Sequence, residues 1–356
     1  MSKVVVGMSG GVDSSVAAYL LKKQGYDVIG VTMQIWQDED MAVQEAQGGC
    51  CGFSAVEDAR RVAQRLDFPY YVMNFKREFK KSVIDYFTAE YLAGRTPNPC
   101  IACNRYVKWE SLLMRSLDIG ADYIATGHYA RIEKMPNGRY VVRNSVTARK
   151  DQTYALYNLT QQQLARTLMP IGEYTKDEVR QIAEEIGLSV ANKPDSQDIC
   201  FVADHDYASF IERETGTKSV PGNFVDKDGN VLGTHKGIIH YTVGQRKGLG
   251  LSFAEPMYVI AIHPDTNEVV LGKGNEVYTN TVYANHINCM AEASITPGTQ
   301  LVGKVRYNHG GASCRVTMLE DDLLECVFDE PQRAVTPGQA LVLYQNDYVY
   351  GGGSII

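Results

Sequence analysis

The string Ser9-Gly10-Gly11-Val12-Asp13-Ser14 stands between an apolar run and the first stretch with helical periodicity. Glycines let a backbone turn tightly and direct several N–H groups toward one point. The positive end of the following helix and the serine hydroxyls add to that field. These residues, which we call the phosphate loop, therefore predict a cradle for phosphate oxygens. The alternative interpretation is a glycine-rich turn that only caps a helix.

No lysine follows the phosphate loop, and the chain contains no G-x-x-x-x-G-K-[ST] string. The usual machinery of γ-phosphate transfer is therefore not expected. Asp13 is the nearby carboxylate best suited to hold Mg²⁺, and a role in shaping the turn is an equal alternative.

Three cysteines lie in polar strings that could support thiol chemistry. Cys100 and Cys103 follow two prolines within Thr96–Asn104, and Cys200 lies in Lys193–Phe201. The thiolate is the nucleophilic form, and Cys103 is expected just ahead of a helix whose positive end would favour it. The other cysteines are interpreted as buried, idle or loop residues: Cys50, Cys51, Cys289, Cys314 and Cys326.

The elements that must position these groups alternate over about the first 200 residues. The predicted strands are Lys3–Met8, Asp27–Met33, Pro69–Phe75 and Asp122–Gly127. The predicted helices are Ser14–Gln24, Ala55–Leu66, Lys76–Ala93 and Tyr106–Leu117. Strands joined by helices imply a parallel sheet covered on both faces, which binds its ligand at the carboxyl ends of its strands.

The pattern changes toward the C-terminus. Tyr129–Asn144 predicts a hairpin with Asn137-Gly138 as its turn, and Thr175–Glu178 has the spacing of a capping box that starts a helix running to Gly187. Beyond about residue 220 the predicted strands include Gln300–Asn308, Ser313–Met318, Leu323–Phe328 and Gln339–Leu343. They indicate an all-β tail, either a small barrel or a sandwich.

Composition narrows the class of protein. The chain has 356 residues, 44% hydrophobic and 22% charged, which excludes wholesale disorder and suggests two or three domains. Eight cysteines are too sparse for a disulfide scaffold. No apolar run is long enough to span a membrane, and the N-terminus has no signal or transit pattern, so we expect a cytoplasmic protein without a membrane partner.

A net charge of −7 disfavours non-specific nucleic-acid binding, so such a partner would need a local basic patch. Residues 131–150 hold six basic side chains against Glu133 alone: Arg131, Lys134, Arg139, Arg143, Arg149 and Lys150. Smaller groups are Arg246-Lys247 and Lys304, Arg306, His309 and Arg315. A phosphate-binding strip and a solvated charged face are the two interpretations.

These strings together resemble one family, the bacterial and mitochondrial tRNA-specific 2-thiouridylases, within the PP-loop ATP pyrophosphatases. The matching strings are Gly7–Ser15, Gly94–Trp109, Ala125–Arg131, Arg149–Tyr154, Asp195–Phe201 and His240–Gly250. Ser-Gly-Gly-x-Asp-Ser carries the superfamily likeness, and the cysteine strings with Gly-Gln-Arg-Lys-Gly-Leu-Gly narrow it to this family.

The resemblance implies an α/β protein with an N-terminal Rossmann-like parallel sheet of the PP-loop, adenine nucleotide alpha-hydrolase-like type. A small central domain and a C-terminal all-β barrel would follow. The expected domains are a PP-loop ATP-binding catalytic domain at 1–205, a central linking, tRNA-contacting domain at 206–272 and the barrel at 273–356.

The implied activity is that of a tRNA-uridine 2-sulfurtransferase. ATP, with Mg²⁺, would adenylate the C2 oxygen of the wobble uridine, and a protein persulfide would then supply sulfur to give 2-thiouridine. Cys200 would carry the persulfide, and Cys103 would be the partner nucleophile that ends in a disulfide with Cys200. The implied partners are tRNAs for Lys, Glu and Gln and a sulfur donor, either a cysteine desulfurase or a sulfur-relay protein.

The resemblance also implies the binding residues. Those for the nucleotide are Gly7, Met8, Ser9, Gly10, Gly11, Val12, Asp13, Ser14, Met33 and Gly127, with Met33 and Gly127 beside the adenine. Those for the tRNA and its target base are Asn98, Pro99, Cys100, His128, Arg149, Lys150, Asp151, Arg306, Tyr307 and Gln339. His128 could equally be a buried structural histidine.

The chain departs from the family at Cys100, where many members carry an Asp assigned to acid–base work. That role is therefore open, and three thiols, Cys100, Cys103 and Cys200, could converge. Three thiolates with one open position would suit a 4Fe-4S cluster. A persulfide relay without metal is the competing interpretation, and zinc is the third.

Two other classes of function stay open at this stage. One is another PP-loop adenylating enzyme, either tRNA cytidine-modifying or amide-forming, which would not need Cys103 and Cys200. The other is a non-catalytic RNA-binding protein with a relic nucleotide site.

Overall fold

The computed structural model describes residues 1–35, 53–194, 199–202 and 206–356. By internal contacts these residues form two compact units. Unit 1 comprises 1–83, 100–205 and 346–349, and unit 2 comprises 84–99, 206–345 and 350–356, within the described ranges. Each is described here by itself. The three-part division at 205/206 and 272/273 stays a prediction.

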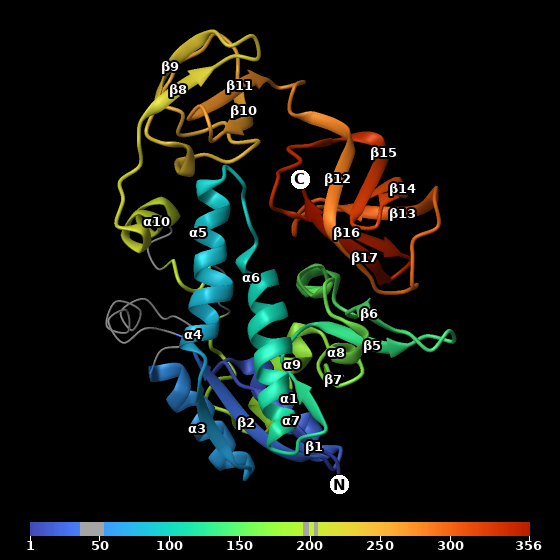
Figure 1. The fold of residues 1–356 in the computed structure, drawn as a ribbon. Helices are drawn as coiled ribbons and strands as arrows, with labels where there is room; N and C mark the ends of the chain where they lie inside the picture. The colour runs from blue at the N-terminus through green and yellow to red at the C-terminus, as the bar shows by residue number, and fades with distance from the viewer. Residues whose placement is uncertain (36–52, 195–198, 203–205) are drawn as a thin grey trace. The chain divides into compact units, whose positions relative to one another are not determined.

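Unit 1 is built on a five-stranded parallel sheet in the order β3-β2-β1-β4-β7. Figure 1 labels β1, β2 and β7 of this sheet. Its strands are β1 (Lys3–Gly7), β2 (Asp27–Gln34), β3 (Tyr70–Asn74), β4 (Tyr123–Ala125) and β7 (Thr167–Leu168). The central strand β1 is buried on both sides, because Val4, Val5 and Val6 have no exposed surface. The continuous apolar run of β1 predicts a strand that is covered by helices on both faces of the sheet.

One face of this sheet packs against α1 (Val12–Lys23), α3 (Phe53–Leu66) and α9 (Lys176–Glu185), whose apolar residues share one core with Val4 and Val6. On the other face, Leu112 approaches Gly7 and α7 (Leu113–Asp118) packs on β4. The capping box that starts α9 is present as predicted, with Thr175 and Glu178 each bonded to the other's backbone.

Two predicted helices are less regular than expected, and one of them is longer. Lys76–Ala93 forms α4 (Lys76–Phe79), the π-helical η2 (Lys80–Ile84) and α5 (Asp85–Leu92). The helix expected over Tyr106–Leu117 begins earlier, with α6 (Pro99–Ala102) and the π-helical η3 (Cys103–Leu112) leading into α7. π-Helical turns are rare and often found at functional sites.

Unit 1 also contains the predicted hairpin, β5 (Ala130–Lys134) and β6 (Tyr140–Asn144), with Gly138 at φ +85° in its turn. The shorter elements between the hairpin and α9 are η4 (Ala148–Lys150), η5 (Thr153–Leu156) and α8 (Gln161–Leu164).

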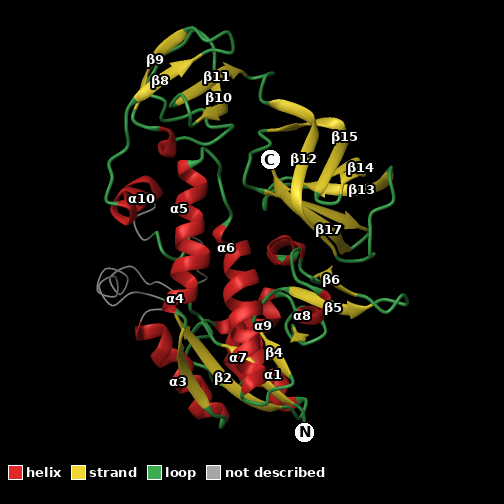
Figure 2. Cartoon of the chain, in the orientation of Figure 1, coloured by secondary structure: helices red, strands yellow, loops and turns green. Residues whose placement is uncertain are grey.

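Unit 2 includes a four-stranded sheet and a barrel (Figure 2). The sheet, in the order β10-β11-β8-β9, is made of β8 (Gly222–Val225), β9 (Val231–His235), β10 (Met257–His263) and β11 (Glu268–Lys273). The short η6 (Ile238–His240) follows β9, and α10 (Tyr207–Thr215) packs against α5 through Tyr207 on Tyr91 and Phe210 on Phe87.

The barrel closes because β12 (Tyr278–Cys289) pairs with both β15 (Leu323–Arg333) and β17 (Tyr348–Ile355). The other barrel strands are β13 (Thr299–Lys304), β14 (Ala312–Glu320) and β16 (Ala340–Gln345). A closed sheet leaves no unpaired edge. The predicted α/β class with a C-terminal all-β barrel is therefore confirmed.

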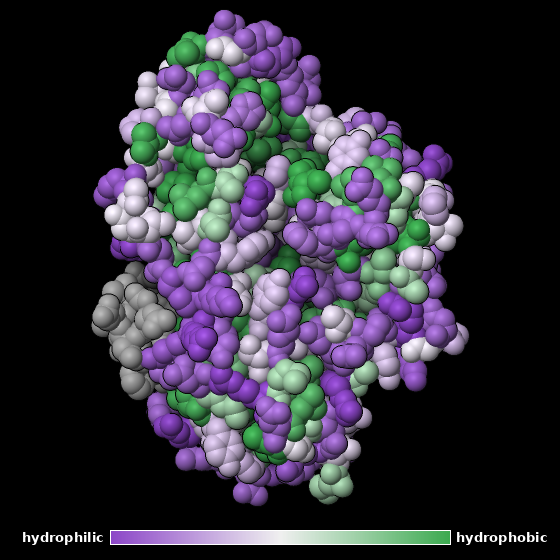
Figure 3. All heavy atoms as spheres, viewed as in Figure 1, coloured by the Kyte–Doolittle hydropathy of each residue, from purple (hydrophilic) through white to green (hydrophobic). Residues whose placement is uncertain are grey.

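The face drawn in Figure 3 mixes hydrophilic and hydrophobic residues. No helix in the described part of the chain is both long enough and apolar enough to cross a membrane.

His235 fixes one corner of the four-stranded sheet. Its Nδ1 accepts from the Gly237 N–H at 3.0 Å, and its Nε2 lies 3.1 Å from the Asn267 carbonyl oxygen. Both contacts suit the neutral ring protonated at Nε2. Burial lowers the pKa of His235, and the nearby His240 adds to the shift.

We predict that His235 makes the chain acid-sensitive. Its pKa is lower in the folded than in the unfolded chain, so its stabilising effect is present above about pH 6.5 and is lost as the pH falls below that. In urea titrations from pH 8 to pH 5, His235→Gln should flatten the pH dependence by up to ~1.4 kcal/mol per pH unit. The exposed His263→Gln is the control, and equal slopes for all three proteins would contradict the prediction.

Candidate functional site

The phosphate loop joins β1 to α1 at the carboxyl edge of the parallel sheet, as predicted. The Ser9 N–H donates to Ser14 Oγ at 3.2 Å, and the Ser14 and Ser15 hydroxyls donate to the Gly11 carbonyl at 3.3 and 2.8 Å. Gly11 is the N-cap of α1 and has no side chain to bond the first N–H groups of the helix. Met8 and Val12 are buried in the core, so their side chains serve packing and only their backbone is suited to a ligand.

Two glycines are required by close backbone approaches. Gly10 has φ +69°, and a Cβ there would lie 2.3 Å from the Ala55 carbonyl oxygen. A Cβ on Gly127 would lie 2.6 Å from the Ser14 nitrogen. Gly127 therefore lies directly against the start of α1, and any larger residue would push the two segments apart.

The residues expected around the adenine follow neighbouring strands. Gly7 ends β1, Met33 lies near the end of β2, and Gly127 follows β4. Because β2 and β4 flank β1, Met33 and Gly127 lie on opposite sides of the phosphate loop. This arrangement is compatible with a base held between them, a role that stays a prediction.

Asp13 is held by two partners at the start of α1. Its Oδ1 accepts from Lys176 Nζ at 2.7 Å and from the Tyr129 hydroxyl at 2.7 Å, and its Oδ2 lies 2.9 Å from Lys176 Nζ. This carboxylate is suited to shaping the loop and fits a metal ion poorly. Mg²⁺ is commonly bound through substrate phosphates with one or two carboxylates.

A second lysine reaches the other end of the phosphate loop. Lys193 Nζ donates to the Gly10 carbonyl at 3.1 Å and to Asp58 Oδ2 at 2.8 Å. Lys176 and Lys193 thus supply, from distant segments, the cations that the loop's own sequence lacks. The sequence analysis missed both, because neither stands in a string that points to phosphate.

The placement of the cysteines corrects the sequence analysis. The helical segment starts at Pro99, so Cys103 lies inside it, at the first residue of η3, and Cys100 occupies its first turn. The positive end of the helix therefore favours an anion at Cys100, not at Cys103. Cys100 is exposed, and Cys103 and Cys200 are partly exposed.

The segments that carry Cys103 and Cys200 both pack on α4. The ring of Phe201 meets the ring of Phe79 edge to face, with centroids 5.8 Å apart, and α4 packs against η3. The string Asp195–Ile199 lies partly outside the described residues, as do Cys50 and Cys51.

The metal-cluster hypothesis is not supported by the arrangement of the described residues, among which no three His, Cys, Asp or Glu side chains form a ligand group. Cys100, Cys103 and Cys200 are all described. The described cysteines therefore do not form the ligand set of an iron–sulfur cluster.

His128 lies between η3 and the segment that approaches the phosphate loop. Its Nδ1 is 2.7 Å from Thr126 Oγ1, and its ring is 5.5 Å from that of Trp109. Loss of hydration holds the pKa of His128 well below its usual range, and the charge of Lys108 adds to the shift. The ring is therefore neutral at physiological pH and able to contact a neutral base.

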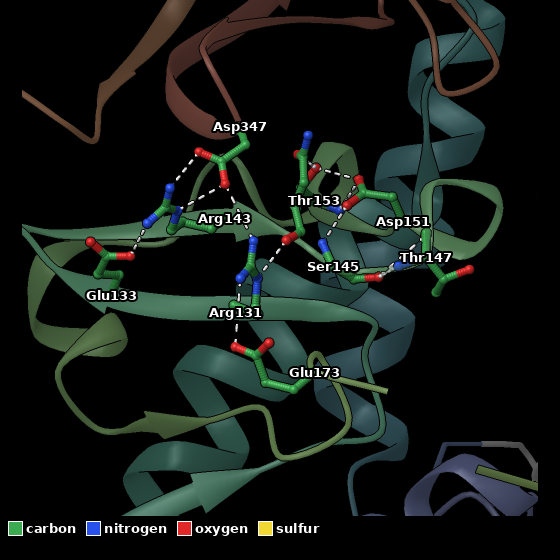
Figure 4. A network of polar contacts seen from close by, with 10 residues as sticks. Arg131, Glu133, Arg143, Ser145, Thr147, Asp151, Thr153, Glu173 and Asp347 are labelled. Carbon is green, nitrogen blue, oxygen red and sulfur yellow. Dashed lines mark hydrogen bonds and ion pairs between the residues drawn. The ribbon is translucent and has the colours of Figure 1, made fainter. Parts of the chain in front are cut away.

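Two arginines of the predicted basic strip, Arg131 and Arg143, are paired with carboxylates within unit 1 (Figure 4). Asp347 accepts from Arg143 Nη2 at 2.6 Å and Nε at 3.1 Å, and from Arg131 Nη2 at 3.3 Å. Arg143 also pairs with Glu133, and Arg131 lies 3.6 Å from Glu173. These two arginines fix the hairpin to the turn that holds Asp347. Phosphate binding by the strip stays a prediction.

In the string Arg149–Asp151, Asp151 holds a turn within unit 1 (Figure 4), whereas the two basic residues lie at the surface. Asp151 accepts from the Ser145 N–H at 2.9 Å and from the Thr153 hydroxyl at 2.5 Å, which holds the turn between them. Arg149 is exposed and Lys150 is partly exposed on η4. Contact of Arg149 and Lys150 with tRNA stays a prediction.

Unit 2 carries the remaining residues predicted to contact tRNA. Gln339 Nε2 donates to the Thr96 carbonyl at 2.7 Å, and the Thr96 N–H donates to the Pro337 carbonyl at 2.8 Å. Gln339 thus anchors the segment that leads to Asn98 and Pro99.

Arg306 and Tyr307 are the other two predicted tRNA contacts in unit 2. Arg306 donates to the Arg333 carbonyl at 2.9 Å, and the neighbouring Tyr307 is 43% exposed. Their contact with tRNA is likewise untested.

Family models match three stretches: a tRNA methyl transferase HUP domain over 2–204, a tRNA methyl transferase PRC-barrel domain over 208–273 and an aminomethyltransferase beta-barrel domain over 279–355. A protein of Lachnoclostridium phytofermentans named tRNA-specific 2-thiouridylase MnmA is 67% identical over the whole of both chains. The chain belongs to the tRNA-specific 2-thiouridylase family, a family of enzymes.

Other similarities are weaker. A protein of the same name from Acetivibrio thermocellus is 58% identical over 99% of both chains. A solved 4-thiouridine synthetase–RNA complex with bound ATP has 19% identity and a TM-score of 0.34, covering 60% of this chain and 50% of that one.

The glycine contacts give a test of the phosphate loop. We predict that Gly10→Ala lowers the affinity for ATP at least ~10-fold in calorimetry, because the new Cβ must displace Ala55 and distort the loop. The matched control is Gly25→Ala, which has φ +88° but nothing within 4 Å of the added carbon. It should cost only the backbone strain, ~1–2 kcal/mol in stability, and leave ATP affinity unchanged. Equal ATP affinity in the two variants would refute this role for Gly10.

Proposed function

We propose that the chain is a tRNA-uridine 2-sulfurtransferase that uses ATP to make 2-thiouridine at the wobble position. The observation that carries the proposal is that unit 1 holds the phosphate loop at the edge of a parallel sheet together with Cys103 and Cys200, whose segments share the support of α4. The whole-chain identity of 67% to a relative named as a 2-thiouridylase favours thiolation over the methyl transfer in the family models' descriptions.

In the first step the phosphate loop binds the phosphates of MgATP through its backbone N–H groups and the first turn of α1. The uracil O2 attacks the α-phosphorus, the bond to the bridging oxygen breaks, and pyrophosphate leaves. Lys176 and Lys193 hold the two ends of the loop through Asp13 and Gly10 and so keep its N–H groups in place.

In the second step a persulfide on Cys200 supplies sulfur. Its terminal sulfur bonds to C2, and AMP leaves with the C2–O electron pair. The Cys103 thiolate then attacks the Sγ of Cys200, which breaks the S–S bond and leaves the sulfur on the base. The resulting Cys103–Cys200 disulfide needs two electrons from a thiol reductant before the next cycle.

The partners follow from the same chemistry. The tRNAs for Lys, Glu and Gln are the proposed substrates, and a cysteine desulfurase or a sulfur-relay protein is the proposed donor. Arg149, Lys150, Arg306 and Tyr307 are the proposed contacts to RNA. A tRNA substrate and a disulfide that must be reduced both favour the cytoplasm.

We predict that Cys103→Ser and Cys200→Ser each lower 2-thiouridine formation at least ~100-fold while ATP binding is unchanged, because each removes a sulfur that the transfer requires. The measurement is mass analysis of tRNA nucleosides after incubation with ATP, Mg²⁺, reductant and a cysteine desulfurase with cysteine. Cys289→Ser, in β12 of the barrel, is the matched control and should keep full activity. Full activity in either single variant would overturn the assignment of the cysteines.

Mass analysis of the wild-type reaction, together with a measurement of pyrophosphate release, also distinguishes a 2-thiouridylase from another adenylating enzyme and from a non-catalytic RNA-binding protein. Pyrophosphate release that depends on tRNA, with a different modified nucleoside or an amide as product, would identify another adenylating enzyme. Binding of tRNA without any release of pyrophosphate would identify a non-catalytic protein.

A further inference from the structure

Lys108 is a half-buried cation in η3 that no step above uses. Its Nζ donates to Asn104 Oδ1 at 2.8 Å. Asn104 is itself buried and donates through Nδ2 to the Ala155 carbonyl at 2.9 Å. The amine is thus aimed by a fixed neutral group, whereas most lysine amines extend into solvent.

Within the described ranges, no carboxylate pairs with Lys108. Taking an ammonium partly out of water is costly unless an anion compensates it. A rigidly held cation without a counter-ion therefore points to an anionic ligand.

The residues near Lys108 indicate where that anion would bind. Trp109, the next residue in η3, has its ring 5.5 Å from that of His128, and the charge of Lys108 helps to lower the pKa of His128. His128 follows Gly127, which lies against Asp13 and Ser14. Cys103 lies five residues before Lys108 in the same π-helix. Residues five apart are joined by the hydrogen bonds of a π-helix, so they lie on neighbouring turns. Lys108 therefore lies between the phosphate loop and the nucleophilic cysteine.

We propose that Lys108 binds the α-phosphate of the nucleotide, which becomes the AMP leaving group. This inference rests on the proposed function. The loop and the first turn of α1 serve the pyrophosphate end, whereas the α-phosphate must face the base and Cys103. When the C2–S bond forms and the C2–O bond breaks, negative charge grows on the departing AMP. Lys108 stabilises that charge and keeps its own proton.

The test compares ligands with and without an α-phosphate. In calorimetry on the full chain, Lys108→Met should weaken AMP binding about tenfold and leave adenosine binding unchanged. Lys108→Arg should recover much of the AMP affinity. Lys23→Met, in the last turn of α1 away from the phosphate loop, should match the wild type for both ligands.

Two results would overturn the proposal. Equal weakening of AMP and adenosine would show that Lys108 only supports the fold. Unchanged AMP affinity, with or without a changed pH profile for alkylation of Cys103, would show that its charge serves another group. A wild-type protein that binds AMP but forms no 2-thiouridine would refute the proposed function, and the assignment of Lys108 to the α-phosphate would be decided separately by the binding data.

Discussion

The close approach of bare backbone around the start of α1 is the constraint on which the site depends. Gly10 lies against Ala55 and Gly127 lies against Ser14, each at a distance that excludes a Cβ. These contacts join the phosphate loop to α3 and to the segment after β4, so the nucleotide site and His128 belong to one rigid arrangement. The Ser9 and Ser14 hydroxyls bond to each other, and Ser14 Oγ also bonds to the Gly11 carbonyl. Backbone N–H groups are the donors that such a loop can present to phosphate oxygens.

The positively charged side chains near the phosphate loop come from other segments of the chain. Lys176 and Lys193 lie 163 and 183 residues after the atoms they contact, and each is paired with a carboxylate. Lys108 differs because a neutral amide holds it. The two paired lysines fix the geometry of the loop at little net charge, whereas the third leaves positive charge uncompensated at the point where a phosphate would face the base.

Local patterns in the sequence predicted the fold well. The parallel sheet, the hairpin at Asn137-Gly138, the capping box at Thr175 and the strands of the barrel all depend on short-range periodicity and turn chemistry, and all are present. The phosphate loop was found because its six residues are contiguous. The lysines and the Arg131–Asp347 and Arg143–Asp347 pairs were missed because they join segments far apart in the chain. Counting charges along residues 131–150 overstated the free positive charge for the same reason, since Asp347 and Glu173 lie outside that window.

The position of the helix start changes the interpretation of Cys100. A pattern of polar residues after two prolines suggested a loop up to about Tyr106, but proline is well tolerated in the first turn of a helix, and the helix begins at Pro99. Cys100 therefore lies where backbone N–H groups and the helix dipole stabilise an anion by ~0.3–1 kcal/mol. An Asp at this position, as the family resemblance leads one to expect, would gain the same stabilisation as a thiolate. The change thus preserves a site for negative charge in the first turn of the helix, while Cys103, one turn further along, lies beyond the reach of that stabilisation.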